Sequence, residues 1–329
     1  MNFVIAIILK AIMKKIITIT VNPTLDKSVL VPALIENQKL RCTDIKYEPG
    51  GGGINISRAI KKLGGSSKAL FLAGGNFGLY FIDLFKKKKI EYESFSIKNE
   101  TRESLIIFDE SNAKQYLLDM QGPIVFENEW HHLLTHISKL INVDFIVASG
   151  SLPRAIPIDF YAQIAKIAKK IGAKFILDSS GEPLKLALNE GLYLIKPNLK
   201  EMGILTAINK IDKESAKVEA LKIIKTNKCE AIVISLGADG ALLVTNDFTE
   251  HFLAPEINVK STVGAGDSML AGIILKLAEN DNLQNAVRYG VACGAAATMN
   301  SGTTLCNKVD ADDLFENYDI RILTNFKSK

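Results

Sequence analysis

The chain has 329 residues, of which 47% are hydrophobic and 23% charged, so it can bury a substantial core in one large or two medium domains. This composition excludes a disordered chain and a small scaffold held together by disulfides. The formal net charge is only +4 and no dense basic block occurs, which argues against nucleic-acid binding.

The first feature in chain order is an apolar segment over residues 3–13 that is interrupted by Lys10. It is shorter than the roughly 20 apolar residues that span a bilayer. A secretory signal carries basic residues before its apolar stretch, whereas Lys14 and Lys15 follow this one. We therefore expect residues 1–13 to lie before the folded domain as an N-terminal extension, of which residues 1–12 precede Met13 as the natural start, and we expect no membrane partner.

The N-terminal third mixes helices with two β-rich segments. β-branched residues predict a buried strand over residues 16–21. The segments of about 25–48 and 91–120 lack a helical period, and we expect them to pair as a small accessory sheet above the strand ends. The other elements predicted here are a helix over 54–63, a strand over 68–73 and a helix over 79–89.

From residue 127 onwards, strands and helices alternate regularly. This alternation predicts an α/β fold with a parallel sheet that helices cover on both faces. The predicted helices span residues 127–141, 158–171, 215–226, 265–279 and 283–299, and the predicted strands span 145–148, 174–177, 193–195 and 231–234, with a hairpin over 241–253.

The cysteines and histidines indicate no metal site. Cys42, Cys229, Cys293 and Cys306 form no CxxC pair, and the four histidines lack the spacing of metal ligands. We expect reduced thiols in a cytoplasmic enzyme.

The strongest chemical signal is the run from Thr262 to Asp267, TVGAGD, which directly precedes a helical pattern. Glycines permit a tight turn, and a helix N-terminus offers unpaired N–H groups and a positive potential. Together they suit an anionic transition state, beside which Asp267 can accept a proton from an attacking hydroxyl. The alternative is a simple glycine turn followed by an aspartate in the first helical turn.

A second glycine run, Gly50 to Gly53, precedes Asn55 and a helix. Helix capping needs only one polar residue, so four glycines indicate that something lies against bare backbone. The run is not a Walker A loop, because no GK[ST] follows it. A flexible structural loop is the alternative interpretation.

Polar residues also follow two later predicted strands. Asn198 and Glu201 are three residues apart and would share a helix face, where they could hold a magnesium-bound water network near phosphates. Helix capping explains the same pair. Ser235 and Gly237 could likewise contact phosphates or form only a turn.

These motifs, in this order, resemble the PfkB (ribokinase-like) carbohydrate kinases over nearly the whole chain. The resemblance rests on Asn22-Pro23-Thr24-Leu25-Asp26, the glycine run with Asn55, Lys196-Pro197-Asn198 with Glu201, and the run from Thr262 to Asp267. It implies one three-layer α/β/α domain over residues 14–316, with the small sheet as a lid that pairs across a homodimer.

Within the family, the chain looks most like phosphosugar kinases of the 6-phosphofructokinase type. The implied reaction is ATP-dependent phosphorylation of fructose 6-phosphate at the C1 hydroxyl, which gives fructose 1,6-bisphosphate. Related 1-phosphofructokinases and tagatose-6-phosphate kinases usually carry a lysine where this chain has Gly52. Those two activities stay open as alternatives, as does a non-catalytic sugar-phosphate or nucleotide sensor; a Rossmann oxidoreductase is disfavoured because the strand context is missing.

The resemblance also assigns roles to individual residues. Asp267 would be the general base, and the amides of Gly264, Ala265 and Gly266 would form an anion hole. The implied substrate-binding residues are Asp26, Lys39, Arg41, Gly51, Asn55, Arg102 and Ser151, with Arg102 as the main contact of the 6-phosphate. The implied nucleotide-binding residues are Lys196, Asn198, Glu201, Ser235, Gly237, Thr262 and Asn300, with Asn198 and Glu201 holding Mg²⁺ through water.

The resemblance further implies a potassium site near the Thr262 loop and the segment 297–304. Thr304 stands where the family pattern has arginine after Gly-Thr.

Overall fold

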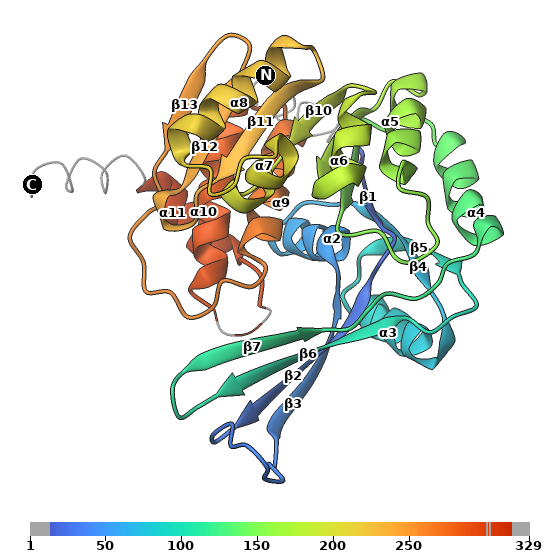
Figure 1. Cartoon of the computed structure of the whole chain (residues 1–329), viewed down its shortest axis with the longest axis vertical. Helices are drawn as coiled ribbons and strands as arrows, with labels where there is room; N and C mark the ends of the chain where they lie inside the picture. The colour runs from blue at the N-terminus through green and yellow to red at the C-terminus, as the bar shows by residue number, and fades with distance from the viewer. Residues whose placement is uncertain (1–13, 301, 303, 318–329) are drawn as a thin grey trace, which may run out of the picture.

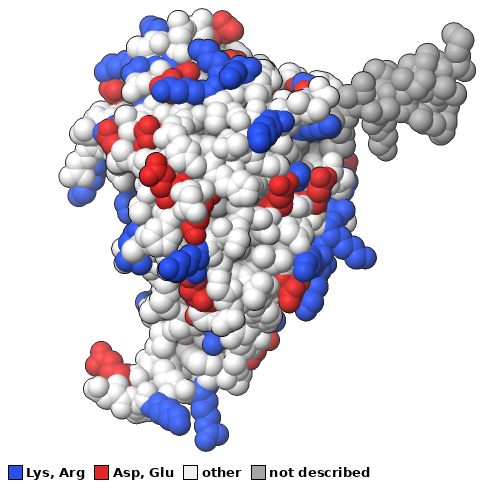
Figure 2. Space-filling model, turned by 90° about the vertical axis from the view of Figure 1, so that its right-hand side faces the viewer, with Lys and Arg blue, Asp and Glu red and all other residues white. Residues whose placement is uncertain are grey.

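The computed structural model describes residues 14–300, 302 and 304–317. The predicted extension over residues 1–13 lies outside the described residues. Among the described residues, no helix has the length and apolar character needed to cross a bilayer. On the face in Figure 2, basic and acidic side chains are both scattered over the surface, in line with the low net charge.

A nine-stranded sheet forms the centre of the molecule, in the order β13-β12-β11-β10-β9-β8-β1-β4-β5 (Figure 1). All neighbours from β11 to β5 are parallel, and the hairpin β12–β13 adds two antiparallel strands at the other edge. The strands are β1 (Ile16–Thr20), β4 (Lys68–Ala73), β5 (Glu91–Ser96), β8 (Phe145–Ser149), β9 (Lys174–Asp178), β10 (Leu192–Ile195), β11 (Cys229–Ser235), β12 (Ala241–Thr245) and β13 (Thr249–Phe252).

Helices cover both faces of this sheet, as the alternation predicts. One face carries α4 (Glu127–Ser138), α5 (Phe160–Lys170), α6 (Gly181–Leu188), α7 (Leu199–Thr206) and α8 (Lys213–Lys225). The other carries α2 (Gly52–Lys62), α3 (Gly75–Lys87), α9 (Ala265–Ala278), α10 (Leu283–Thr298) and α11 (Lys308–Glu316). A 3₁₀ turn spans Gly237–Asp239.

Helix α2 illustrates how sequence spacing produces this packing. Ile56 and Ile60 lie four residues apart, on one face of the helix, and both are fully buried in the core beside α9. Lys61 and Lys62 follow in the last turn, where cations interact favourably with the helix dipole. The helix begins directly after Gly51, and its buried isoleucines fix it against the large sheet.

A second, four-stranded sheet projects from the first (Figure 1), in the order β3-β2-β6-β7. It contains β2 (Thr24–Val31), β3 (Thr43–Gly50), β6 (Arg102–Asp109) and β7 (Lys114–Asp119). The pairs β2–β3 and β6–β7 are antiparallel, whereas β2 and β6 are parallel. We call it the small sheet.

The beginning of the segment 91–120 differs from the expectation, which placed all of it in the accessory sheet. Strand β5 is instead the edge of the large sheet, parallel to β4. The reason is side-chain burial: Phe95 is 4% exposed and belongs to the core cluster, and Tyr92 stacks on Phe71 of β4 with 5.7 Å between ring centroids. Only the part from β6 onwards belongs to the small sheet.

Candidate active site

Helix α9 begins at the run that the sequence singles out. Gly264 is its N-cap residue, with φ of 76°, and a Cβ atom there would lie 2.7 Å from Leu305 Cδ2, so glycine is required. Within the described chain, no side chain caps this helix end, and Asp267 is the acidic residue of the first turn. The N–H groups of this turn are therefore available to an anion. The Ala265 amide also makes a long 3.3 Å bond to the Thr262 carbonyl.

Asp267 lies among charges from three other elements. Asn55 of α2 donates a hydrogen bond from Nδ2 to Asp267 Oδ2 at 2.9 Å. Burial, followed by the nearby Asp178 carboxylate, raises the pKa of Asp267 to about 6, although the Asn55 hydrogen bond and the Lys196 charge lower it. A carboxylate with such a pKa is mostly ionised at neutral pH and basic enough to accept a proton.

Lys196 follows β10 and is buried, with its Nζ atom 3.5 Å from Asp178 Oδ1. Asp178 ends β9, so the two residues meet at the carboxyl edge of neighbouring parallel strands. A Cβ atom built on Gly266 would lie 3.3 Å from Lys196 Nζ, which places this ammonium beside the first turn of α9. The lysine therefore adds a positive charge to the helix end.

Asp26 is a second carboxyl group with an unusual pKa. It lies in β2 of the small sheet, is 9% exposed and pairs in register with Glu48 of β3. Burial raises the pKa of Asp26 to about 7, against the lowering effects of Arg58, a Thr24 hydrogen bond and Arg102. At neutral pH this group is partly protonated, so it can both donate to and accept from a hydroxyl.

The glycine run from Gly50 to Gly53 packs against protein atoms as well as forming a helix start. Gly51 is the N-cap residue of α2. A Cβ atom on Gly52 would lie 2.0 Å from Ser149 Oγ at the end of β8. Ser149 therefore leaves no room for a side chain at position 52. The lysine that the related kinases carry there would require Ser149 to move.

Two cavities adjoin the start of α9. The larger, of 700 Å³, is lined by Asn198, Ser235, Gly237, Thr262, Ala265 and Gly266 together with apolar residues of α9 and α10. The second, of 540 Å³, is lined by Ser151, Asp178, Glu201 and Asp267, and by the backbone of Gly52. Four of the predicted nucleotide residues, Asn198, Ser235, Gly237 and Thr262, thus line the larger cavity, whereas Glu201 and Asp267 line the second.

Asn198 and Glu201 form a reciprocal capping box at the start of α7. The Asn198 amide donates to Glu201 Oε2 at 2.9 Å, and the Glu201 amide donates to Asn198 Oδ1 at 2.8 Å. Burial raises the pKa of Glu201, and the nearby Asp178 adds to this effect. The described residues contain no group of three His, Cys, Asp or Glu side chains that could cage a metal. One carboxylate and one amide, those of Glu201 and Asn198, are too few ligands for a dehydrated metal ion. They suit a Mg²⁺ ion that keeps several of its waters.

Arg102 begins β6 at the base of the small sheet, with an 11% exposed side chain. Its Nη1 atom pairs with the Asp119 carboxylate, and its Nη2 atom donates to the Asn22 carbonyl at 3.4 Å. Its buried Nε atom has no hydrogen-bond partner among the described residues. Arg102 lines a cavity of 450 Å³ with Arg154, and so has donor capacity toward an anion.

Three predicted site residues lie elsewhere. Lys39 and Arg41 are exposed in the connection between β2 and β3, at the far end of the small sheet (Figure 1). Asn300 donates from Nδ2 to the Ala296 carbonyl and does not line the larger cavity. For the potassium expectation, Ser261 Oγ donates to the Gly302 carbonyl at 3.0 Å, while residues 301 and 303 lie outside the described part.

Reasoning from the sequence assigned no role to Asp178, Ser149 or Arg58. Asp178 and Ser149 each end a strand of the large sheet, and polar residues at the carboxyl ends of parallel strands are a signal that could have identified them. Arg58 lies inside a helical pattern and has no such signal.

Comparisons with known proteins identify the family of this chain. The model of the family described as "pfkB family carbohydrate kinase" matches residues 16–310. The ATP-dependent 6-phosphofructokinase isozyme 2 of Escherichia coli K12 is 38% identical over 92% of this chain and 98% of its own length. The 1-phosphofructokinase of Bacillus subtilis is 33% identical over 86% of this chain and 92% of its own.

Among solved structures, the crystal structure of phosphofructokinase-2 from Escherichia coli in complex with potassium is similar, with a TM-score of 0.90 and 38% identity. It covers 93% of this chain and 100% of its own chain.

Proposed function

The chain belongs to the pfkB family of carbohydrate kinases, and we propose that it transfers the γ-phosphoryl group of ATP to the C1 hydroxyl of fructose 6-phosphate. The product is fructose 1,6-bisphosphate. The observation that carries this choice of sugar is the 38% identity to a 6-phosphofructokinase isozyme 2 over 92% of the chain. Gly52 also favours fructose 6-phosphate, because the position of Ser149 disfavours the lysine that related 1-phosphofructokinases and tagatose-6-phosphate kinases carry there.

Catalysis in this proposal depends on position and charge. Asp267 accepts the proton of the C1 hydroxyl as that oxygen attacks, because its pKa of about 6 leaves it ionised at neutral pH. The amides of Gly264, Ala265 and Gly266 stabilise the charge on the phosphoryl group in transfer. Lys196, beside the same helix turn, adds a fixed positive charge.

The sugar phosphate occupies the space between the small sheet and α9. Asp26, Asn55 and the Gly51 backbone hold sugar hydroxyls, and Ser151 lines the adjoining cavity. Arg102 binds the 6-phosphate, since a guanidinium can contact two phosphate oxygens at once. The small sheet, which carries Asp26 and Arg102, acts as a lid that excludes water during transfer.

The nucleotide occupies the 700 Å³ cavity, whose apolar lining suits an adenine ring. Ser235, Gly237, Thr262, Asn198 and Lys196 contact it, and Asn300 stabilises the nearby end of α10. Asn198 and Glu201 hold hydrated Mg²⁺ at the phosphates, and this ion supplies charge neutralisation there. A potassium ion near the Thr262 loop is part of the proposal, because the similar Escherichia coli structure is described in complex with potassium.

A homodimer through the small sheet explains how Lys39 and Arg41 can bind substrate. Both cations are exposed at the end of the small sheet, away from the sugar site of their own chain. In a dimer that pairs two small sheets, they can reach the sugar phosphate of the partner. We also propose a cytoplasmic location, which suits the free thiols of Cys42, Cys229, Cys293 and Cys306.

The test is a coupled assay of the purified protein with Mg-ATP and a panel of fructose 6-phosphate, tagatose 6-phosphate and fructose 1-phosphate. We expect the highest kcat/KM with fructose 6-phosphate. A preference of more than about tenfold for another sugar would reject the assignment. Fructose 1-phosphate is the second candidate, because a 1-phosphofructokinase is 33% identical to this chain. The absence of turnover with every sugar would favour a sensor.

A further inference from the structure

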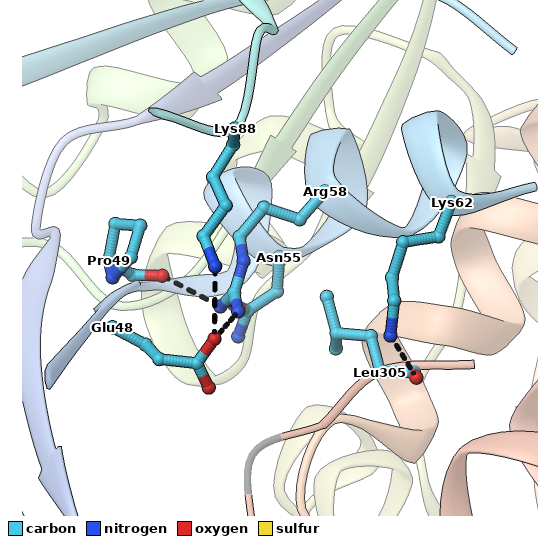
Figure 3. A network of polar contacts seen from close by, with 7 residues as sticks. All are labelled: Glu48, Pro49, Asn55, Arg58, Lys62, Lys88 and Leu305. Carbon is cyan, nitrogen blue, oxygen red and sulfur yellow. Dashed lines mark hydrogen bonds and ion pairs between the residues drawn. The ribbon is translucent and has the colours of Figure 1, made fainter. Parts of the chain in front are cut away.

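A buried arginine, Arg58, contacts Asn55, which in turn contacts Asp267. Arg58, in the second turn of α2, is 6% exposed and belongs to the polar network in Figure 3. Its Nη1 atom donates to the Pro49 carbonyl at 2.8 Å and to Asn55 Oδ1 at 3.1 Å, while its Nη2 atom contacts Glu48 Oε1 at 2.5 Å. A buried guanidinium is costly unless it is paired, so these partners fix its position.

The contact with Asn55 determines which way the amide of that residue points. Asn55 Oδ1 accepts from Arg58, and Asn55 Nδ2 donates to Asp267 Oδ2. A flipped amide would direct its NH₂ group at the guanidinium and its oxygen at the carboxylate, which are two unfavourable contacts. Arg58 therefore holds the one orientation in which Asn55 donates to Asp267.

Arg58 is also a charge that two functional carboxyl groups share. It lowers the pKa of both Asp26 and Asp267. The other groups that act on Asp267 are Asp178, Lys196 and the Asn55 amide, and those that act on Asp26 are Thr24, Arg102 and Glu48.

Glu48 connects this arrangement to the small sheet. It lies near the end of β3, one residue before Pro49, and both contact Arg58. A single polar path thus runs from Glu48 through Arg58 and Asn55 to Asp267. Lys88, beyond the end of α3, contacts the same Glu48 oxygen at 3.3 Å (Figure 3).

We propose that Arg58 is a positioning residue for phosphoryl transfer: it holds the Asn55 amide toward the Asp267 carboxylate and is itself held by Glu48 at the end of the small sheet. This inference rests on the proposed kinase function. It assigns Arg58 no contact with substrate; its effect is transmitted through Asn55 and through its charge.

The test compares four variants with the wild type, using whichever sugar phosphate of the panel is turned over best. Arg58→Met removes the charge and the contacts, and Glu48→Gln removes only the anchoring charge. Arg58→Lys keeps the charge but replaces the planar guanidinium, whose two nitrogens reach separate acceptors, by a single ammonium nitrogen. Lys88→Met is the matched control, since Lys88 contacts Glu48 but neither Asn55 nor Asp267. For each variant, kcat, both KM values, the pH profile of kcat/KM and the Tm are measured.

We expect Arg58→Met to lower kcat by at least about tenfold, because the base is no longer oriented. The acid limb of its kcat/KM profile should move upward by roughly half a pH unit or more, because a positive charge near Asp267 is lost. Arg58→Lys should restore the position of that limb but not kcat. Glu48→Gln should lower kcat severalfold, and in all variants the KM for ATP should stay unchanged.

Two results would overturn the inference. The first is wild-type kcat and an unmoved acid limb in Arg58→Met. The second, decisive if Arg58→Met does not fold, is wild-type kcat in both Glu48→Gln and Arg58→Lys. A lower Tm without any kinetic change would indicate a merely structural role. The proposed function fails separately, through the sugar preference of the wild type.

Discussion

The two carboxyl groups of the proposed site, Asp26 and Asp267, differ in environment, and this difference favours different roles for them. Asp26 is 9% exposed, and burial raises its pKa to about 7. Asp267 lies at the N-terminus of α9, beside Lys196, and its pKa is raised to about 6. The lower pKa and the adjacent helix amides favour Asp267 as the base, whereas the partly protonated Asp26 suits hydrogen bonds to sugar hydroxyls.

The raised pKa of Asp26 has a consequence for stability. A carboxyl group that is harder to ionise in the folded state costs folding free energy as pH rises. The pKa rises from 3.8 to about 7, so this cost develops between about pH 4 and pH 7 and is complete above. It amounts to at most roughly 4 kcal/mol.

We expect Asp26→Asn to become progressively more stable than the wild type as pH rises from 4 to 7, and then to keep a constant advantage, while its kinase activity falls. Urea unfolding at a series of pH values measures this difference. Asp247→Asn makes the same charge change in the exposed turn between β12 and β13 and should give no such rise. A difference that is independent of pH in Asp26→Asn would contradict the assigned pKa.

Among the secondary-structure elements, the sequence pattern predicted those strands and helices whose formation depends on residues close together in the sequence. The strand over residues 68–73 and the long helices α9 and α10 were predicted nearly to their ends, because their apolar periods are uninterrupted. Helix α6 was missed because it is only 8 residues long and contains Pro183. The sheet to which β5 belongs depends on partners distant in the sequence, and no local signal specifies it.

The residues of the candidate site were likewise predicted only where a pattern in the nearby sequence marks them. Glycine runs before helices pointed to Asn55 and Asp267, and the three-residue spacing of Asn198 and Glu201 pointed to a helix start, because helix N-termini have a sequence signature. Arg58 was missed, because its role depends on neighbours brought together by the fold. For Lys39 and Arg41, the sequence suggested the chemistry but not the position at the far end of the small sheet.

The start of α9 offers a test at this scale. Gly264 and Gly172 both have φ of 76°, but only Gly264 would bring a Cβ atom into collision, 2.7 Å from Leu305 Cδ2. Gly172→Ala should therefore lose only the backbone preference, about 1 kcal/mol of unfolding free energy. Gly264→Ala should lose more, and its kcat should fall because the anion-binding amides are displaced.

Urea unfolding and steady-state kinetics of the two alanine variants give the comparison. Equal losses of stability, together with unchanged kcat in Gly264→Ala, would show that the geometry of this turn is not needed for transfer.

For the molecule as a whole, the small sheet is the surface that the proposed homodimer would cover. It projects from the large sheet (Figure 1) and carries exposed apolar side chains, with Leu117 57%, Leu118 47% and Ile45 54% exposed. Several exposed apolar side chains on one small sheet are compatible with an interaction surface. Burial between two small sheets would cover them and bring Lys39 and Arg41 toward the site of the second copy.

Leu117→Glu should therefore convert a dimer into a monomer, as measured by size-exclusion chromatography with light scattering. We also expect the KM for the sugar phosphate to rise at least about tenfold, since two cations no longer reach the phosphate. Ile141→Glu is the matched control, because Ile141 is 77% exposed but lies after α4, away from the small sheet. A dimer that survives Leu117→Glu, or a monomer with unchanged KM, would contradict this account.

We propose that Asp267 of this sugar-phosphate kinase accepts the proton of the attacking hydroxyl. The most direct measurement is the kcat of Asp267→Asn with Mg-ATP and fructose 6-phosphate, beside the affinity of the variant for both substrates. We predict a fall in kcat of about 10²- to 10⁴-fold with nearly unchanged binding, because asparagine keeps the shape of the side chain but cannot accept the proton. A fall of less than about tenfold would contradict the assignment of Asp267 as the base.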